Sequence, residues 1–485
     1  MIIANIKKIT LCTFMLLLGA LYSCQDDFLD RVPSDKLNDE NSYQDESGFE
    51  KGLIGSYSRL RALYTKSSLL YAAELITDNA EIKFQSPSND EQQYDQVALN
   101  PANGLVNEFW TNCLLTIANC NIILNKINGV DFDETAKNRI TGEAKFLRAF
   151  CYFYLVQLYG NVPLVTQSFN SPEEVYNADL TLKPSSDVYP FIVEDLQSAE
   201  SLMPGELNTD KTRASLGTVK AVLGKVYLAM HDYDQAATKL KEVIDLNQYQ
   251  LVSDYGSLFS AGNNNKEESM LEVQFLSGQT IGNNFSALFT PPNLNTTLFP
   301  NNQQGSGRIV PTLDMMNTYE TGDKRKEASV GDTVTLADGS NVYARYGKKF
   351  VDWKATDLED GSVTFTILRY ADVLLSYAEA LNEQGNTADA LTYINQVRER
   401  ASLPDLSGLT QDACRLALEK ERRVEFFDEG DRWFDLVRTG RAQEVMNAYF
   451  ENLKLNFSVE DHELIFPIPF SEIQNNPEIK QNPGY

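Results

Sequence analysis

Apolar residues recur at three- and four-residue spacing along much of this chain, which is the pattern of amphipathic helices. The clearest stretch runs from Glu134 to Tyr159, where a single stripe is formed by Ala144, Leu147, Phe150, Tyr154 and Leu158. Gly160 and then Pro163 follow, and this order is typical of a helix end. Similar periodicity over residues 48–64 and 108–127 predicts two further helices.

Two segments have the pattern of paired antiparallel helices around a tight turn. In residues 214–246, small Gly224 and Ala236 permit a close approach of the helices, while Tyr227 fills the space between layers. Residues 367–401 repeat the pattern around Gly385 and Asn386. The arrangement resembles a tetratricopeptide unit, and residues 134–159 and 411–447 supply partners for further pairs. The predicted fold class is therefore mainly α, with a tetratricopeptide-like helical repeat layer.

Residues 65–105 and 250–366 have a different character, with frequent glycine, asparagine and proline and short strand-like runs such as 270–275 and 334–336. Long loops in an otherwise ordered protein are usually functional. A repeat pair cannot bury its apolar faces alone, so we expect the pairs to share one layer. The two loop-rich segments are then expected to pack over that layer as an irregular lobe that bears the ligand face.

The first residues have the order of a secretory signal: Lys7 and Lys8, an apolar run over 11–21, then Ser23 before Cys24. The run is shorter than the ~20 residues that a membrane-spanning helix needs. The pattern resembles a bacterial lipoprotein signal (residues 1–23), in which Cys24 is lipidated and becomes the first mature residue. Plain secretion is the alternative. Residues 24–45 are polar and acidic, and they are expected to form a flexible tether.

Composition narrows the function classes. The formal net charge of −26 disfavours nucleic acid as a partner, because a polyanion repels phosphate backbones. Only two histidines are present, His231 and His462, which leaves little material for a histidine-based triad or metal site. Cys113 and Cys120 lie seven positions apart and are interpreted as small buried hydrophobes. We predict no catalytic residues, no metal and no cofactor.

Motifs spread over the mature chain resemble those of the SusD/RagB family, the lipid-anchored nutrient-binding proteins of Bacteroidetes outer membranes. The matching segments are EAKFLRA (143–149) with LYGNVPL (158–164), LRYADVLL (368–375) with AEALN (378–382), ERRVEF (421–426) with GDRWFDLVR (430–438), and LIFPIP (464–469) with QNPGY (481–485).

Charged residues within these motifs lie on or beside apolar helices, so we expect most of them to form a buried network that joins helix pairs, because a buried arginine must be paired. A direct ligand role is the alternative. The residues concerned are Arg148, Arg369, Glu379, Arg422, Arg423, Glu425, Arg432 and Asp435. Trp110 and Trp433 lie in helical apolar stripes and are predicted core residues, which leaves Trp353 as the tryptophan of the loop-rich region.

The resemblance implies a non-enzymatic protein on the extracellular face of the outer membrane. It would capture an oligosaccharide and pass it to a SusC-like TonB-dependent transporter. Three alternatives stay open: a RagB-like peptide-binding uptake component, a helical-repeat scaffold with protein partners only, and an enzyme that acts on glycans with paired carboxylates.

A sugar site needs aromatic rings for the flat C–H faces and polar groups for the hydroxyls. The ligand loops of the family fall near residues 70–100 and 280–355 of this chain. The candidate ligand-binding residues there are Asp78, Asn79, Phe84, Tyr94, Arg345, Tyr346 and Trp353. Loop anchoring is the alternative role for each aromatic, and helix capping the alternative for Asp78.

Overall fold

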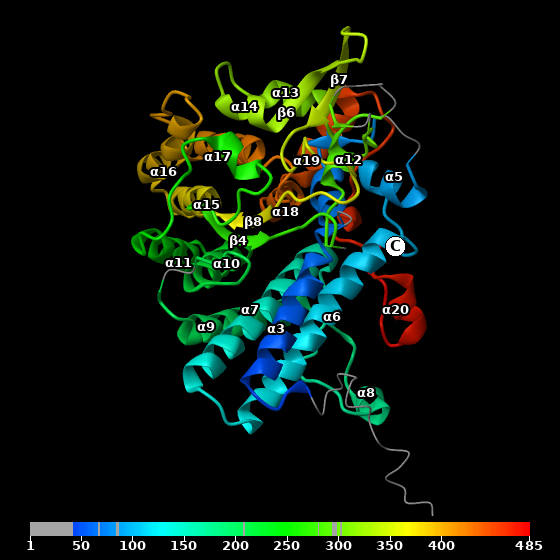
Figure 1. The fold of residues 1–485 in the computed structure, drawn as a ribbon, viewed down its shortest axis with the longest axis vertical. Coiled ribbons are helices and arrows are strands. Elements are labelled where there is room, and N and C mark those ends of the chain that lie inside the picture. Colours follow the sequence, from blue (N-terminus) through cyan, green and yellow to red (C-terminus); the bar gives the residue numbers. More distant parts are fainter. Residues whose placement is uncertain are drawn as a thin grey trace, which may run out of the picture.

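The computed structural model describes residues 42–485, apart from 66–67, 84–86, 207–208, 280, 293–297 and 301–302. It is mostly helical (Figure 1). The long helices are α3 (Glu46–Arg61), α6 (Gly104–Lys126), α7 (Glu134–Tyr159), α9 (Ser185–Leu202), α10 (Leu216–Ala229), α11 (Tyr233–Asp245), α15 (Tyr370–Glu383), α16 (Thr387–Arg400), α17 (Gln411–Glu425) and α19 (Ala442–Asn452). Within the described residues, none of the helices is long and apolar enough to cross a bilayer.

These helices pack in sequence as one layer. α6 contacts α7, α7 contacts α9, and the order continues through α10, α11, α15 and α16 to α17, while α3 lies against both α6 and α7. The contact between α11 and α15 joins the two predicted repeat pairs although more than a hundred residues separate them in the chain. The predicted fold class, and the single layer shared by both pairs, are therefore confirmed.

The close approach predicted at Gly224 is present between α10 and α11. An ideal Cβ placed on Gly224 would lie 2.6 Å from Cγ of Leu240, which is closer than real Cβ contacts occur. Asp232 then starts α11 by accepting a hydrogen bond from the backbone N–H of Gln235. The equivalent turn between α15 and α16 contains Gly385 at φ +82°, a conformation that other residues rarely adopt.

Short elements make up the rest of the described chain. The short helices are α4 (Ser68–Leu70), the π-helical turn η3 (Tyr71–Leu75), α5 (Asn89–Asp95), η4 (Ile127–Gly129), α8 (Pro172–Asn177), η5 (Tyr255–Phe259), α12 (Phe285–Phe289), α13 (Leu313–Thr318), α14 (Lys324–Ser329), α18 (Arg432–Arg438), η7 (Asp461–Leu464) and α20 (Phe470–Asn475). The strands are β1 (Ala80–Glu81), β2 (Val162–Pro163), β3 (Leu182–Lys183), β4 (Ser269–Val273), β5 (Val310–Pro311), β6 (Val330–Thr335), β7 (Asn341–Gly347) and β8 (Phe365–Arg369).

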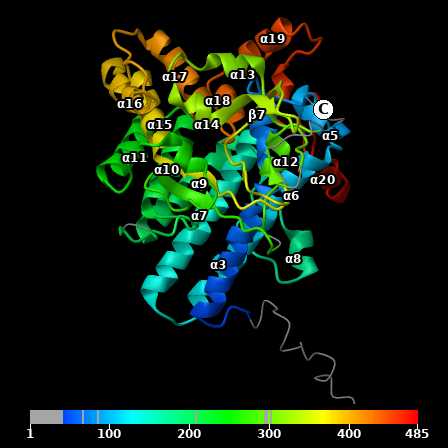
Figure 2. The same ribbon diagram turned by 45° about the horizontal axis from the view of Figure 1, so that its top comes forward.

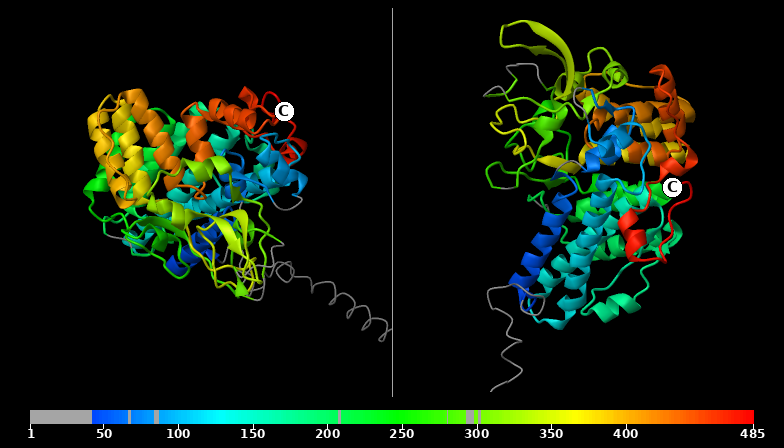
Figure 3. Two further views of the ribbon diagram at one scale, coloured as in Figure 1. Left: turned by 90° about the horizontal axis from the view of Figure 1, so that it is seen from above. Right: turned by 90° about the vertical axis from the view of Figure 1, so that its right-hand side faces the viewer.

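Antiparallel strand pairs hold the loop-rich segments together. β1 pairs with β5, so residues 65–105 and 250–366 are joined directly, while β4 pairs with β8 and β6 with β7. The right-hand view of Figure 3 shows these loops and strands on one side and helices α15 to α17 on the other. In Figure 1 the elements α13, α14 and β7 lie at the end of the molecule opposite to the start of α3, and Figure 2 shows them after this end has been turned forward.

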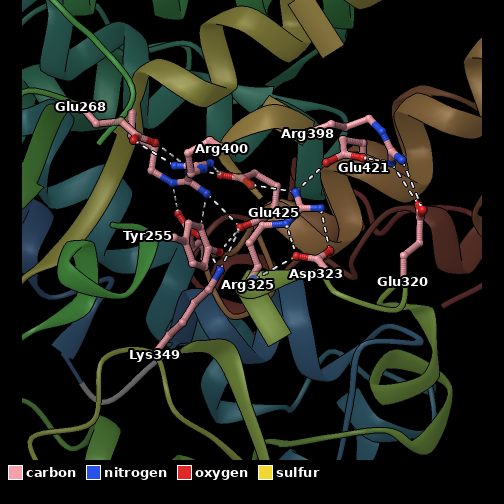
Figure 4. A network of polar contacts seen from close by, with 12 residues as sticks. Tyr255, Glu268, Glu320, Asp323, Arg325, Lys349, Arg398, Arg400, Glu421 and Glu425 are labelled. Carbon is pink, nitrogen blue, oxygen red and sulfur yellow. Dashed lines mark hydrogen bonds and ion pairs between the residues drawn. The ribbon is translucent and has the colours of Figure 1, made fainter. Parts of the chain in front are cut away.

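A buried network of ion pairs fastens the lobe to the helical layer (Figure 4). Glu425, at the end of α17, is shared by Arg325 of α14, Arg369 of β8 and Arg400 of α16. Burial alone would raise the pKa of the Glu425 carboxyl, but the three guanidinium charges hold it well below its ordinary value.

The other charged motif residues are paired in the same way, which confirms the predicted network. Arg148 binds Asp195 with Nε 2.7 Å from a carboxylate oxygen, and Arg422 bridges Asp372 and Asp435 at 2.7 Å each. The remaining pairs are Arg423 with Asp78 and Asp314, Arg432 with Asp78, and Arg438 with Glu379. Trp110, Trp433, Cys113 and Cys120 are buried, as predicted.

A segment near the C-terminus donates hydrogen bonds to the last carbonyls of α7. The backbone N–H of Phe466 donates to the carbonyl of Leu158 at 2.5 Å. The side-chain amide of Asn482 donates to the carbonyl of Tyr159 at 3.0 Å and to that of Phe466 at 2.8 Å. Carbonyls at a helix end have no partner within the helix, so this segment satisfies groups that α7 cannot satisfy itself.

Candidate ligand-binding site

An aromatic cluster lies beside the β6–β7 hairpin. The ring of Trp353 stacks on that of Phe299, with centroids 5.6 Å apart and planes 13° from parallel. Tyr346 of β7 meets Trp353 edge-on at 6.1 Å. Phe299 and Tyr346 are buried, whereas Trp353 is only half-buried. Trp353 therefore offers exposed ring surface on a base that is held in place by two other rings.

Tyr346 is fixed by a close approach to the partner strand. It lies opposite Gly331 in the β6–β7 register, and an ideal Cβ on Gly331 would lie 2.2 Å from Cζ of the tyrosine. Only a glycine leaves room for the ring there. The hydroxyl of Tyr346 donates to the carbonyl of Thr333 at 3.4 Å. Rigid support of this kind favours stacking by Trp353, because little side-chain freedom remains to be lost on binding.

Side chains alternate along a strand, so the two neighbouring candidates of β7, Arg345 and Tyr346, point to opposite sides. Tyr346 belongs to the aromatic cluster with Val334 and Ala344, while Arg345 bonds across to the carbonyl of Pro311 at 2.6 Å and to Glu81. The structure therefore brings Tyr346 and Trp353 together and separates them from Arg345.

Arg345 instead borders a charged cleft between the lobe and the C-terminal helices, with a volume of about 510 Å³. Its charged lining residues come from the lobe and from α17 to α19, and they balance in sign: Lys83, Arg345, Arg423, Arg432 and Arg441 against Asp78, Glu81, Asp314, Glu419 and Glu444. Tyr449 supplies an aromatic wall, and Leu313 and Leu453 are exposed apolar residues beside it.

Asp78 lines this cleft, but its carboxylate is already engaged in ion pairs with two arginines. Nε and Nη2 of Arg432 each lie 2.9 Å from one of its oxygens, and Nη2 of Arg423 lies at 3.0 Å. Burial would raise the pKa of Asp78, yet the charges of Arg432 and Arg423 lower it to about 2. Asn79 is equally occupied, since it donates to Glu74 and accepts from Arg423 at 2.9 Å each. Both residues therefore hold the lobe against α17 and α18.

Tyr94 has no exposed surface, which leaves no ring face on which a sugar could stack. Its ring packs edge-on against Phe466 at 5.9 Å and beside Tyr71 at 6.3 Å. Phe84 and the predicted lipid site Cys24 lie outside the described residues.

Sequence reasoning missed the cleft residues Tyr449 and Arg441, because both lie near α19, outside the loop-rich segments. It also missed the group in which Arg308 pairs with Glu91, which accepts a hydrogen bond from Tyr71 at 3.0 Å. Glu91 also forms a capping box with Ser88, and that S-x-x-E pattern was the one local signal available.

Comparisons with known proteins agree over nearly the whole chain. A family profile described as "SusD family" matches residues 331–485, and one described as "Starch-binding associating with outer membrane" matches residues 27–228. "SusD-like protein P2" of Formosa agariphila is 28% identical, over 98% of this chain and 99% of that protein. "Starch-binding protein SusD" of Bacteroides thetaiotaomicron is 25% identical, over 85% and 84%. A solved structure described as "Laminarin binding SusD-like protein" is 30% identical with a TM-score of 0.79, and the match covers 91% of this chain and 100% of that one.

Proposed function

Because this chain belongs to the SusD family, we propose that it is a cell-surface glycan-binding protein that captures an oligosaccharide and delivers it to a SusC-like TonB-dependent transporter in the outer membrane. The protein holds its ligand without chemical change. Lipidation at Cys24 would keep it on the extracellular face of that membrane, with residues 24–45 as the tether.

The observation that carries the glycan proposal is the half-buried indole of Trp353 on its base of Phe299 and Tyr346. Sugar rings have flat C–H faces that stack on aromatic rings, and such contacts dominate the affinity of many carbohydrate sites. The match to a laminarin-binding structure at 30% identity supports the same class of ligand.

Binding to a panel of purified polysaccharides and oligosaccharides tests this proposal. The protein should bind at least one glycan in isothermal titration, and laminarin is the first to try. Incubation with that glycan should release no new reducing ends. If no glycan binds, the proposed ligand class is wrong, and reproducible release of reducing ends would mean that the protein is an enzyme.

A second candidate function is peptide uptake, as in RagB-like proteins, and the charged cleft favours it. The partly exposed charges of Asp314, Arg441 and Glu444, together with apolar Leu313 and Leu453 on the cleft wall, suit a ligand that carries both charges and apolar side chains. Titration with a mixture of short peptides distinguishes the two functions. Peptide binding that is lost in Arg441→Ala but retained in Trp353→Ala would place the ligand in the cleft.

A further inference from the structure

The short helix α8 (Pro172–Asn177) is exposed to an unusual degree. With the described chain as its surroundings, none of its residues is buried, and Tyr176 is 89% exposed. Ser171 and Pro172 start the helix, since the serine hydroxyl accepts from the N–H of Glu174 and proline suits the first helical position. A helix of about one and a half turns is stabilised little by its own hydrogen bonds, and burial of side chains does not stabilise α8 either.

The apolar side of α8 points away from the body. An open hollow of about 720 Å³ lies between α8 and the rest of the protein, and Glu173, Glu174 and Asn177 line it. At 100° per residue, Val175 projects away from the residues that line the hollow, and Tyr176 projects from the flank of the helix, about 60° from Glu173. Surface helices normally turn their apolar side inward, so the orientation of α8 is reversed. Val175 and Tyr176 are thus two adjacent exposed apolar side chains that are available for contact with another molecule.

The position of α8 indicates where that other molecule lies. α8 and the start of α3 at Glu46 occupy the same end of the molecule in Figure 1 and in the right-hand view of Figure 3. Residues 24–45 connect Glu46 to the predicted lipid site, and a chain of this length reaches at most about 75 Å. The end that carries α8 is thus the end to which the predicted tether is attached.

The charges of α8 favour a protein over the lipid surface itself. Glu173 and Glu174 are exposed beside the apolar pair, and carboxylates are repelled by anionic lipid headgroups. A protein pocket with lysine or arginine around its rim would complement them.

We propose that Val175 and Tyr176 form a docking knob for the transporter of the proposed function, and that they enter an apolar pocket with a basic rim on its extracellular surface. This inference rests on the proposed function. Tyrosine is enriched among the few residues that dominate the affinity of protein interfaces, so one exposed ring can carry much of the contact.

The test uses the full-length lipoprotein, co-expressed with the TonB-dependent transporter encoded beside it and carrying an affinity tag. Val175→Ser/Tyr176→Ala should reduce the transporter recovered with it from solubilised membranes by about tenfold or more. Tyr343→Ala is the matched control, because Tyr343 is also exposed (67%) but lies on the β6–β7 hairpin at the other end. A photoreactive benzoylphenylalanine at position 176, but not at position 343, should cross-link to the transporter.

Each outcome decides the matter. Equal recovery of the transporter with the double variant, or cross-linking from position 176 into lipid alone, would overturn the docking knob while the proposed function stands. Failure of the wild-type protein to retain the transporter would overturn both the delivery step and the knob. The titrated glycan affinity of the double variant should equal that of the wild type, which separates loss of docking from loss of folding.

Discussion

Arg432 donates two parallel hydrogen bonds, each 2.9 Å long, to the carboxylate of Asp78, which lies 354 positions earlier in the sequence. The pair ties the segment after η3 to the first turn of α18, and both side chains are 4% exposed. Bidentate contacts of this kind fix the relative orientation of the two side chains as well as pairing their charges. Asp78, a predicted sugar contact, thus has its carboxylate engaged in ion pairs with the helical layer.

Asp78→Asn should therefore lower stability and leave glycan affinity unchanged. Removing one partner of a buried ion pair costs up to ~3–5 kcal/mol of unfolding free energy, and Arg432 keeps Glu419 at 3.5 Å as a weaker partner. Denaturant titration gives the stability and isothermal titration the affinity. Loss of glycan binding at an unchanged melting temperature would restore Asp78 as a ligand contact.

Trp353→Ala should weaken glycan binding by about thirtyfold, or ~2 kcal/mol, because the indole is the exposed member of its aromatic cluster. Tyr343→Ala serves as the control, since it removes an exposed ring from the other side of β7. Isothermal titration with the best glycan measures both variants. Affinity within twofold of wild type for Trp353→Ala would make Trp353 a loop anchor, provided the variant keeps its melting temperature.

Asp428→Asn should stabilise the protein at neutral pH. Asp428 is fully buried, and neither carboxylate oxygen has a hydrogen-bond partner among the described residues. Burial and then the charge of Glu74 raise its pKa well above the ordinary value, with Lys349 opposing and Glu429 adding to the shift.

The sign of the pH dependence follows. The unfolded carboxyl ionises near pH 4 but the folded one does so only at higher pH, so the wild type loses unfolding free energy as the pH rises between these values. Asp428→Asn removes this loss, and its stability advantage should grow from pH 4 towards neutrality. Thermal melts in matched buffers measure the difference, and an advantage that shrinks with pH would contradict the argument. Glu74, with a pKa raised to about 7 by burial, adds a similar slope in both proteins.

Cys24→Ala should release the protein from the membrane fraction and abolish its labelling with palmitate. The reason is the order of Lys7 and Lys8, the apolar run and Ser23 before the cysteine. Membrane fractionation and metabolic labelling test it, with Cys113→Ser as the control because that thiol is buried in α6. Retention of both anchoring and label would exclude Cys24 as the lipid site.

The helical layer was predictable because its helices are long and periodic, as α7 and the α10–α11 pair show. The ion network was predictable too, since arginines on apolar helices must find carboxylates. The site was harder. The partners of Asp78 lie more than 340 positions away, and no local pattern reveals such a pairing. Tyr94 offered a usable signal, because a single aromatic in the polar helix NDEQQYD is the residue expected to face the core.

The contacts of α7 with Phe466 and Asn482 bear on how the protein is made. α7 emerges from the ribosome more than three hundred residues before Asn482, so its carboxyl end stays incomplete until synthesis is nearly over. Contacts at such long sequence separation form late and slow folding, because a long loop must be closed first. The predicted signal of residues 1–23 implies export of the unfolded chain, and slow folding suits such export. The contact that completes the end of α7 is therefore among the last that the growing chain can form.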